Sequence, residues 1–202
     1  MQKGWIPPVL FTGAVTLLSD TFTDTNGTGL AAHTIAPINS PATSWTEAIN
    51  NFEITSNRAL VVVDTQTLAF LETGISNGTV SAVANGAAGQ VLGIIFRYTD
   101  ANNYFVLQID VTGDTLRLYE NASAVLTLRD SEAVTIAAAT DYTLRAVFNG
   151  TSIVGTVNGG STVTYTSSAN QTATKCGIRH TGDGTGTNVF DDFTVTTSTG
   201  LS

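Results

Sequence analysis

Residues 93–110 read Gly-Ile-Ile-Phe-Arg-Tyr-Thr-Asp-Ala-Asn-Asn-Tyr-Phe-Val-Leu-Gln-Ile-Asp. Two runs rich in β-branched and aromatic residues stand on either side of a short polar break, Asp-Ala-Asn-Asn at 100–103. Such runs favour β-strands, and a short polar break between them is typical of a hairpin turn. The stretch therefore predicts two antiparallel strands, over 90–99 and 103–111.

Polarity alternates within these strands, as it does when one face of a sheet is buried and the other is mixed. The core face takes Phe105, Leu107, Ile109 and Val111, and the other face takes Tyr104, Val106, Gln108 and Asp110. Residues 90–98 are apolar on both faces at their centre, which predicts a position in the middle of a sheet.

The same period of two recurs along the chain, and helical periodicity is hard to find. Asn-Gly pairs, which suit tight hairpin turns, begin at Asn26, Asn77, Asn85, Asn149 and Asn158. Further strands are expected at 19–24, 45–48, 52–55, 58–64, 67–73, 78–84, 114–120, 124–129, 141–149, 151–157, 161–166, 174–180 and 189–197. So many short antiparallel strands predict an all-β, two-sheet sandwich.

The composition limits the kinds of partner. The 202 residues suit one domain, and a net charge of −8 argues against nucleic acid and anionic membranes. Charged residues make up 12% of the chain and the mean hydropathy is +0.17. Low charge suits a protein packed beside copies of itself or other proteins, although a β-rich composition gives the same numbers.

The first eighteen residues differ from the rest. Lys3 precedes an apolar run that Pro7 and Pro8 interrupt, and no Ala-x-Ala cleavage site follows. The run is too short and too interrupted to span a bilayer. We expect residues 1–18 to form an extended attachment arm and residues 19–202 to form the domain, with a long crossing loop over 25–44. The apolar contacts of the arm would come from Trp5, Ile6, Val9, Leu10 and Phe11.

Several segments together suggest a family. They are Leu-Ser-Asp-Thr-Phe-Thr-Asp-Thr-Asn-Gly at 18–27, Trp-Thr-Glu-Ala at 45–48, Phe-Glu-Ile-Thr-Ser-Asn-Arg-Ala at 52–59, Asp-Tyr-Thr-Leu-Arg-Ala-Val-Phe-Asn-Gly at 141–150 and Phe-Asp-Asp-Phe-Thr-Val at 190–195. In order and spacing, residues 18–197 resemble the concanavalin A-like (laminin G-like) jelly rolls of lectins, glucanases and phage virion proteins. The resemblance implies an antiparallel two-sheet jelly roll whose first and last strands pair.

The chain departs from the glucanases of this family. Those enzymes carry a Glu-x-Asp-x-x-Glu strand that places two carboxylates across the scissile bond. Here the glutamates are Glu47, Glu53, Glu72, Glu120 and Glu132, and none has that arrangement. We therefore expect no enzymatic activity.

Pairing of the first and last strands would bring four carboxylates together. Asp20 and Asp24 lie near the start of the predicted domain, and Asp191 and Asp192 lie near its end. Clustered carboxylates suit Ca²⁺, a hard cation that takes six to eight oxygen ligands. The alternative is that they are strand-end residues that make turns; no other cofactor is expected.

A second candidate site is the mixed face of one sheet. Tyrosine rings stack on sugars, and arginine and glutamine donate hydrogen bonds to hydroxyls, so these residue types together predict a carbohydrate platform. The face would carry Arg97, Tyr104, Gln108, Arg117, Tyr119 and Arg145. A half-solvated sheet face or a protein contact surface explains the same residues.

Cys176 has no second cysteine to pair with, so no disulfide within the chain is possible. His180 follows four residues later, on the same face of a predicted strand, and His33 lies in the long loop. A zinc site needs more ligands than this pair offers. We expect a buried thiol beside a hydrogen-bonded histidine.

Two functions follow from these observations. The first is a non-enzymatic phage virion protein, a capsid decoration or tail-associated jelly roll made in the host cytoplasm and held on the virion surface by its arm. Its partners would be other virion proteins and copies of itself. The alternative is a carbohydrate-binding module that adheres to a host or environmental polysaccharide.

Overall fold

The computed structural model describes residues 13–35, 38–63, 65–182 and 187–198. Fifteen strands and one short 3₁₀ helix, η1 (Leu30–Ala32), make up this part of the chain. The strands are β1 (Thr16–Asp20), β2 (Thr46–Ile49), β3 (Phe52–Thr55), β4 (Arg58–Val61), β5 (Thr67–Glu72), β6 (Gly78–Asn85), β7 (Val91–Asp100), β8 (Asn103–Asp110), β9 (Thr115–Ala122), β10 (Val125–Ala133), β11 (Tyr142–Asn149), β12 (Ser152–Val157), β13 (Thr162–Thr166), β14 (Lys175–Thr181) and β15 (Val189–Thr197).

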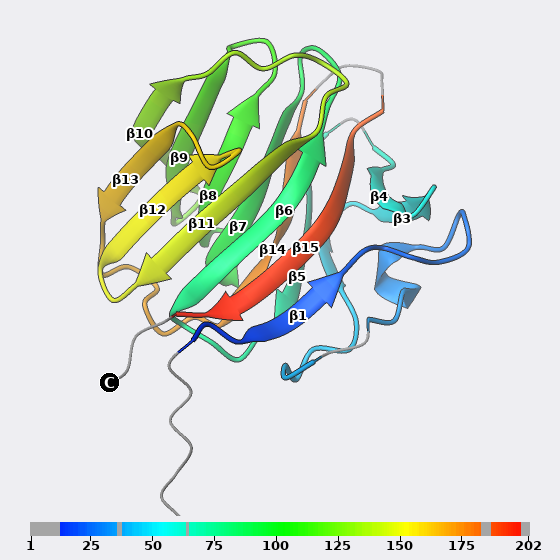
Figure 1. The fold of residues 1–202 in the computed structure, drawn as a ribbon, viewed down its shortest axis with the longest axis horizontal. Helices are drawn as coiled ribbons and strands as arrows, with labels where there is room; N and C mark the ends of the chain where they lie inside the picture. Colours follow the sequence, from blue (N-terminus) through cyan, green and yellow to red (C-terminus); the bar gives the residue numbers. More distant parts are fainter. Residues whose placement is uncertain (1–12, 36–37, 64, 183–186, 199–202) are drawn as a thin grey trace, which may run out of the picture.

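The strands form two stacked antiparallel sheets (Figure 1). Within the described residues, the eight-stranded sheet has the order β13-β12-β11-β6-β15-β4-β3, with β1 beside β15. The seven-stranded sheet has the order β10-β9-β8-β7-β14-β5-β2. The predicted all-β jelly-roll sandwich is confirmed.

The β7–β8 hairpin is the predicted one. Ile94 lies opposite Leu107 and Phe96 lies opposite Phe105, so the core faces of the two strands coincide. Phe96 also stacks on Phe148 of the other sheet, with ring centroids 5.2 Å apart. These side chains are fully buried, and burying each one contributes about 1.5–3 kcal/mol to folding.

The first strand begins earlier than the sequence predicted. β1 pairs with β15, as the resemblance implied (Figure 1). In this pairing Leu18 lies opposite Val195. A bulge between Thr16 and Leu18 lets the successive residues Leu17 and Leu18 both be buried. The boundary expected between residues 18 and 19 is therefore wrong, because residues 16–18 belong to the sandwich.

The five arm residues predicted to make apolar contacts, Trp5, Ile6, Val9, Leu10 and Phe11, lie outside the described residues. The long crossing loop predicted for 25–44 is found between β1 and β2, and it includes η1. Leu30 and Ile35 of this loop are buried in the core.

Candidate functional site

The outer face of the seven-stranded sheet carries an apolar layer of its own. It is separate from the core between the sheets, because its residues alternate along each strand with core residues. We call it the outer-face cluster: Leu68, Ile95, Tyr98, Tyr104 and Val106 are buried in it, and Ile49, Phe70 and Tyr119 are partly buried at its margin.

Three rings of this cluster form a row across the sheet. Phe70 of β5 stacks on Tyr98 of β7 at 4.6 Å between centroids, and Tyr98 stacks on Tyr104 of β8 at 5.9 Å. Strand β14 lies between β5 and β7, where Gly177 is opposite both Phe70 and Ile95. Because Gly177 has no side chain, the Phe70 ring can reach Tyr98. We call Phe70, Tyr98 and Tyr104 the aromatic row.

A bulge places Tyr98 on this face. The register of β7 shifts between Phe96 and Asp100, and Arg97 has a φ of +49°. Strict alternation would put Arg97 on the outer face, but the left-handed conformation turns it into the interior. The prediction that Arg97 lies on the sugar-binding face is therefore wrong, and Tyr98 occupies that face instead.

Arg97 is fully buried between the sheets. Its guanidinium donates hydrogen bonds to the carbonyl oxygens of Gly150 and Ser167 and lies over the Phe148 ring. Burial lowers the pKa of Arg97. Its role is to join the end of β7 to the loops after β11 and β13.

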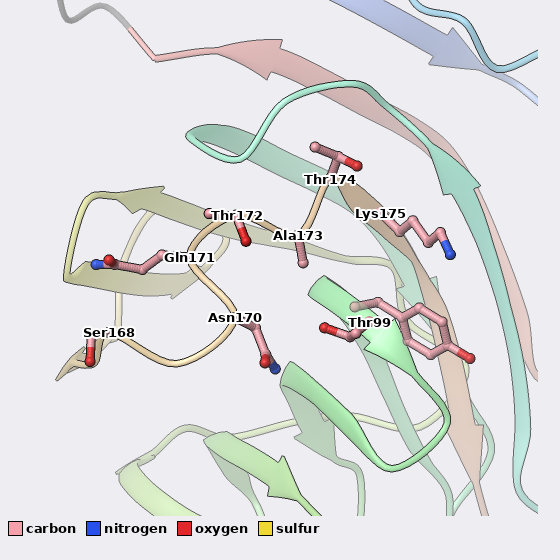
Figure 2. Close-up of a pocket in the computed structure, with 9 residues that line it drawn as sticks. Thr99, Ser168, Asn170, Gln171, Thr172, Ala173, Thr174 and Lys175 are labelled. Atoms are coloured by element: carbon pink, nitrogen blue, oxygen red, sulfur yellow. The ribbon is translucent and has the colours of Figure 1, made fainter.

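Two pockets adjoin the aromatic row, one at Tyr98 and one at Tyr104. The first pocket, about 680 Å³, is lined by Tyr98, Thr99, Lys175 and residues of the loop before β14, including Asn170, Thr172 and Thr174 (Figure 2). The Lys175 ammonium also lies over the Phe70 ring, 5.0 Å from its centroid. This pocket offers hydroxyl, amide and ammonium groups beside an aromatic ring.

The sheet pocket, about 300 Å³, adjoins the row at Tyr104. Tyr104, Asn121 and Arg179 form part of its wall, and Gln66 and Asn102 add further polar groups. Apolar contacts come from Ile49, Leu126 and two alanines. An apolar wall with a few convergent polar groups is the usual composition of a ligand site.

Four of the six predicted platform residues share this outer face. Gln108 lies opposite Arg117 and Val106 lies opposite Tyr119, so the cross-strand register brings Tyr104, Gln108, Arg117 and Tyr119 together. Arg117 forms an ion pair with Asp110, with 2.9 Å between Nη1 and Oδ2.

The sixth predicted residue, Arg145, belongs to the other sheet. It lies in β11, where its Nη2 is 3.5 Å from the Thr79 hydroxyl. The prediction that Arg145 lies on the platform was wrong. Alternation predicts on which face of its strand a side chain lies, but it does not predict which sheet the strand joins.

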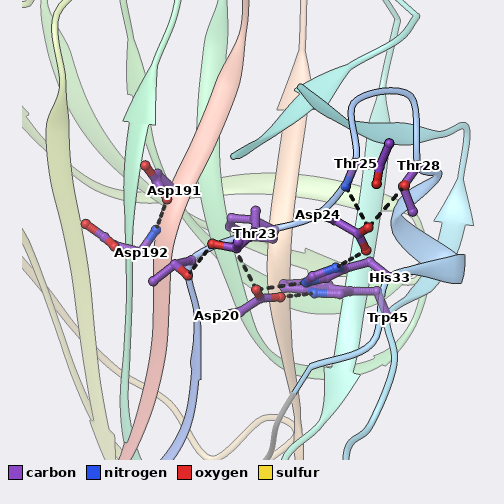
Figure 3. A network of polar contacts seen from close by, with 11 residues as sticks. Asp20, Thr23, Asp24, Thr25, Thr28, His33, Trp45, Asp191 and Asp192 are labelled. Carbon is purple, nitrogen blue, oxygen red and sulfur yellow. Dashed lines mark hydrogen bonds and ion pairs between the residues drawn. The ribbon is translucent and has the colours of Figure 1, made fainter. Parts of the chain in front are cut away.

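The four candidate calcium ligands do not converge. Asp20 and Asp24 hold His33 between them: Nε2 is 3.0 Å from Asp20 Oδ1, and Nδ1 is 2.9 Å from Asp24 Oδ2 (Figure 3). Asp191 lies apart from them and faces Arg58, with 3.4 Å between Oδ2 and Nε. The terminal strands pair as expected, but Asp20 lies opposite Phe193, so the side chains of Asp191 and Asp192 are not beside it.

Asp20 and Asp24, two of the candidate calcium ligands, belong instead to a hydrogen-bonded network. Across the described ranges, no group of three or more His, Cys, Asp or Glu side chains could hold a metal ion. Asp20 also accepts hydrogen bonds from the Trp45 indole at 2.7 Å and the Phe22 amide at 2.8 Å. We call Asp20, Asp24, His33 and Trp45 the histidine network.

His33 pairs with both carboxylates when it is protonated. Burial alone would lower the pKa of His33, but hydrogen bonds with Asp24 and Asp20 outweigh it and leave the pKa raised above 6.5. The hydrogen bond from His33, followed by that from the Thr25 amide, holds the pKa of Asp24 below 3.8. Each ring nitrogen faces a carboxylate oxygen, so the imidazolium satisfies both partners.

The network should make stability depend on pH. A raised pKa means that the contribution of His33 is complete below its ordinary pKa of 6.5 and is lost as the pH rises through the folded value. The contribution of Asp24 has the opposite sign, being complete above 3.8 and lost as the pH falls. We expect the difference in unfolding midpoint between the wild type and His33→Gln to shrink as the pH rises. Thermal unfolding of both proteins, measured from below pH 6.5 upward, checks this prediction. A difference in midpoint that does not change with pH would contradict it. His180 is present in both proteins, so its own titration does not contribute to the difference.

Cys176 and His180 behave as the sequence predicted. Both are buried, and burial raises the pKa of the Cys176 thiol to about 12, which makes it a poor nucleophile. The His180 Nε2 lies 2.7 Å from Gln90 Oε1. The pair is structural.

Comparison with known proteins places the fold. No protein-family model matches the chain, and no curated protein sequence matches it. Solved structures do match, and they are concanavalin A-like jelly rolls of lectins, carbohydrate-binding modules and glycoside hydrolases.

Three of these structures indicate the range. The carbohydrate-binding module CBM66 from Bacillus subtilis has a TM-score of 0.59 at 15% identity, over 79% of this chain and 95% of that one. The Bacillus licheniformis β-glucanase has 0.59 at 12% identity, over 89% and 97%. The Emp46p carbohydrate recognition domain, in a metal-free form, has 0.58 at 10% identity, over 78% and 89%. At such identities the likeness shows the fold alone.

Among the described residues, no helix has the length and apolar character that crossing a membrane would require.

Proposed function

We propose that this protein is a glycan-binding module whose site is the outer face of the seven-stranded sheet. The observation that carries the proposal is the pair of pockets beside the aromatic row, each lined by hydrogen-bonding side chains. The fold likeness to a carbohydrate-binding module and to a carbohydrate recognition domain supports it.

The chemistry of the face suits a saccharide chain. Sugar rings present apolar C–H faces that pack on aromatic rings, while their hydroxyls need hydrogen-bond partners. The pockets supply such partners: Lys175, Asn170 and Thr172 in one, and Asn121 and Arg179 in the other. A saccharide chain that occupies both pockets would meet both sets of partners.

The lining of the pockets supports binding rather than cleavage. A glycosidase places two carboxylates on either side of the scissile bond. Neither pocket has an aspartate or glutamate in its wall. Asp110, on the same face, is paired with Arg117. We therefore propose a non-catalytic module.

Removing the accessible rings of this face should weaken binding. Tyr98 and Tyr104 are 4% and 1% exposed, so the rings that a sugar can contact are Phe70 and Tyr119, which are partly buried at the margin of the outer-face cluster. Phe70→Ala and Tyr119→Ala are each expected to weaken glycan binding about tenfold, the equivalent of about 1.4 kcal/mol for a lost aromatic contact. A glycan array followed by calorimetry on the best hit measures this, with near-ultraviolet circular dichroism to confirm folding.

The matched control is Tyr142→Ala. Tyr142 is partly buried like the margin of the row, but it lies in β11 of the other sheet, where its hydroxyl accepts a hydrogen bond from the Ala137 amide. Binding should be unchanged in this variant. An array on which the folded wild type retains no glycan would refute the proposal, as would full affinity in both Phe70→Ala and Tyr119→Ala.

The expectation of a phage virion protein stays a prediction from the sequence. Its arm residues lie outside the described part of the chain, and the structures compared above are lectin-type modules and an enzyme. Display on a virion surface and contacts between copies are compatible with a glycan site on the sheet.

A further inference from the structure

Arg179 is a buried cation without a counterion. It lies in β14, on the outer face of the seven-stranded sheet, and is 6% exposed. Its Nη1 donates a 3.0 Å hydrogen bond to Gln108 Oε1, a neutral amide oxygen, and its Nε has no partner. Arg117 and Arg129 of the same sheet are paired with Asp110 and Glu120, whereas no ion pair within the described ranges includes Arg179.

Asn121 is a second incompletely bonded group in the same pocket wall. It is 7% exposed, and its Nδ2 donates to the Ala101 carbonyl at 3.2 Å. Its Oδ1 has no hydrogen-bond partner. The sheet pocket therefore combines an uncompensated positive charge with a free acceptor, and its wall contains no carboxylate.

The backbone keeps this arrangement compact. Gly93 of β7 lies opposite both Gln108 and Arg179. A Cβ at Gly93 would be 2.8 Å from the Leu107 carbonyl oxygen and 2.8 Å from Gln108 Cβ. Glycine thus leaves the room in which Arg179 and Gln108 meet, and the hydrogen bond to Gln108 holds the guanidinium.

A desolvated charge is costly unless an opposite charge pairs with it. Carboxylates are the preferred partners of guanidinium, since two parallel hydrogen bonds can form. The chain has a net charge of −8, so it attracts anions only weakly at long range. A preference for an anionic ligand must therefore come from its direct contact with Arg179. The pocket volume of about 300 Å³ is at the small end for ligand sites and suits one sugar ring.

We infer that the sheet pocket binds a carboxylate-bearing sugar ring, so that the preferred ligand is an acidic polysaccharide. The ligand carboxylate pairs with Arg179, a ring hydroxyl donates to Asn121 Oδ1, and the apolar ring face packs on Leu126, which is 39% exposed in the pocket wall. This inference rests on the proposed glycan-binding function. It adds the chemical class of the ligand.

The test compares two oligosaccharides whose rings differ only in carrying a carboxylate or a neutral hydroxymethyl group. Binding of oligogalacturonate and of the neutral galacto-oligosaccharide of equal length and linkage is measured by calorimetry on the full chain. The wild type should prefer the acidic ligand about tenfold or more, as expected for a charge-assisted bidentate pair. The preference should decrease as the salt concentration rises.

Variants assign the preference to Arg179. In Arg179→Gln the preference should vanish while affinity for the neutral ligand remains, and Arg179→Lys should keep part of it because the charge is retained. Arg145→Gln, a cation of the other sheet, is the control and should leave the preference unchanged. Thermal unfolding of each variant without ligand checks that the fold is intact.

The outcomes separate this inference from the function on which it rests. Equal affinity of the wild type for both ligands would overturn the acidic preference and leave the glycan-binding function standing. An undiminished preference in folded Arg179→Gln would also overturn it. Absence of any saccharide binding on a broad array would overturn both.

Discussion

Replacing Asp20 by alanine is expected to lower the free energy of unfolding by about 3–5 kcal/mol, the usual cost of removing one partner from a buried charged network. The Asp20 carboxylate is buried and accepts hydrogen bonds from the Phe22 amide, the Trp45 indole and His33. Its removal leaves all three donors without that acceptor. Denaturant unfolding, with the midpoint reduced and the slope unchanged, measures the effect.

Asp141→Ala is the matched control for this prediction. Asp141 also accepts several hydrogen bonds, from Arg58 and Asn85, and its pKa is lowered to about 2, first by Arg58. However, its side chain is 48% exposed, so water screens the pair and can replace it. The loss should be about 1 kcal/mol or less. Equal losses in the two variants would contradict a special role for the histidine network.

The location of this network explains why its loss should be costly. Phe22, Trp45 and Phe193 are buried side by side, with Trp45 4.9 Å from Phe193 and 5.7 Å from Phe22 between ring centroids. The indole that packs on these rings is also the donor to Asp20. The network therefore fixes the crossing loop over the core where the first and last strands pair.

Local patterns were sufficient to predict most strands. The hairpin over 90–111 follows from alternation and one polar turn, and both signals lie within twenty residues of each other. β1 was placed three residues late, because Leu17 and Leu18 are adjacent and do not alternate. The bulge that buries both depends on pairing with β15, at the far end of the chain.

The candidate site was predicted in part, for a similar reason. Tyr104, Gln108 and Tyr119 follow from alternation within one meander of strands. Tyr98 was missed, because its face depends on the left-handed Arg97, which is held by carbonyls of Gly150 and Ser167 more than fifty positions away in the chain. No local pattern specifies that contact.

Arg179 was missed although a signal existed. The strand over 174–180 was predicted, and Cys176 and His180 were placed on one face, where the structure shows both to be buried. The opposite face of the same strand must then hold Lys175, Gly177 and Arg179. Only the order of strands in the sheet shows that this face adjoins Tyr98 and Gln108.

Gly177→Ala is expected to destabilise the protein strongly and to disturb the aromatic row, although it adds only one methyl group. A Cβ there would stand 2.0 Å from the Ala69 carbonyl oxygen and 2.7 Å from Phe70 Cα. These are backbone atoms of the paired strand, so β5 and β14 would have to separate. We expect a loss of about 4 kcal/mol or more, or failure to fold, because the substitution overpacks a paired strand in the middle of a sheet.

Gly29→Ala provides the control, because it adds the same methyl group where nothing lies within 4 Å of the new Cβ and φ is −62°. Its stability should change by about 1 kcal/mol or less. Denaturant unfolding of both variants measures the difference. Where Gly177→Ala folds at all, the Phe70 ring should lose its place against Tyr98, and glycan affinity should decrease together with stability. A folded Gly177→Ala of wild-type stability would show that β5 and β14 are not packed as described, and the aromatic row would then lose its structural basis.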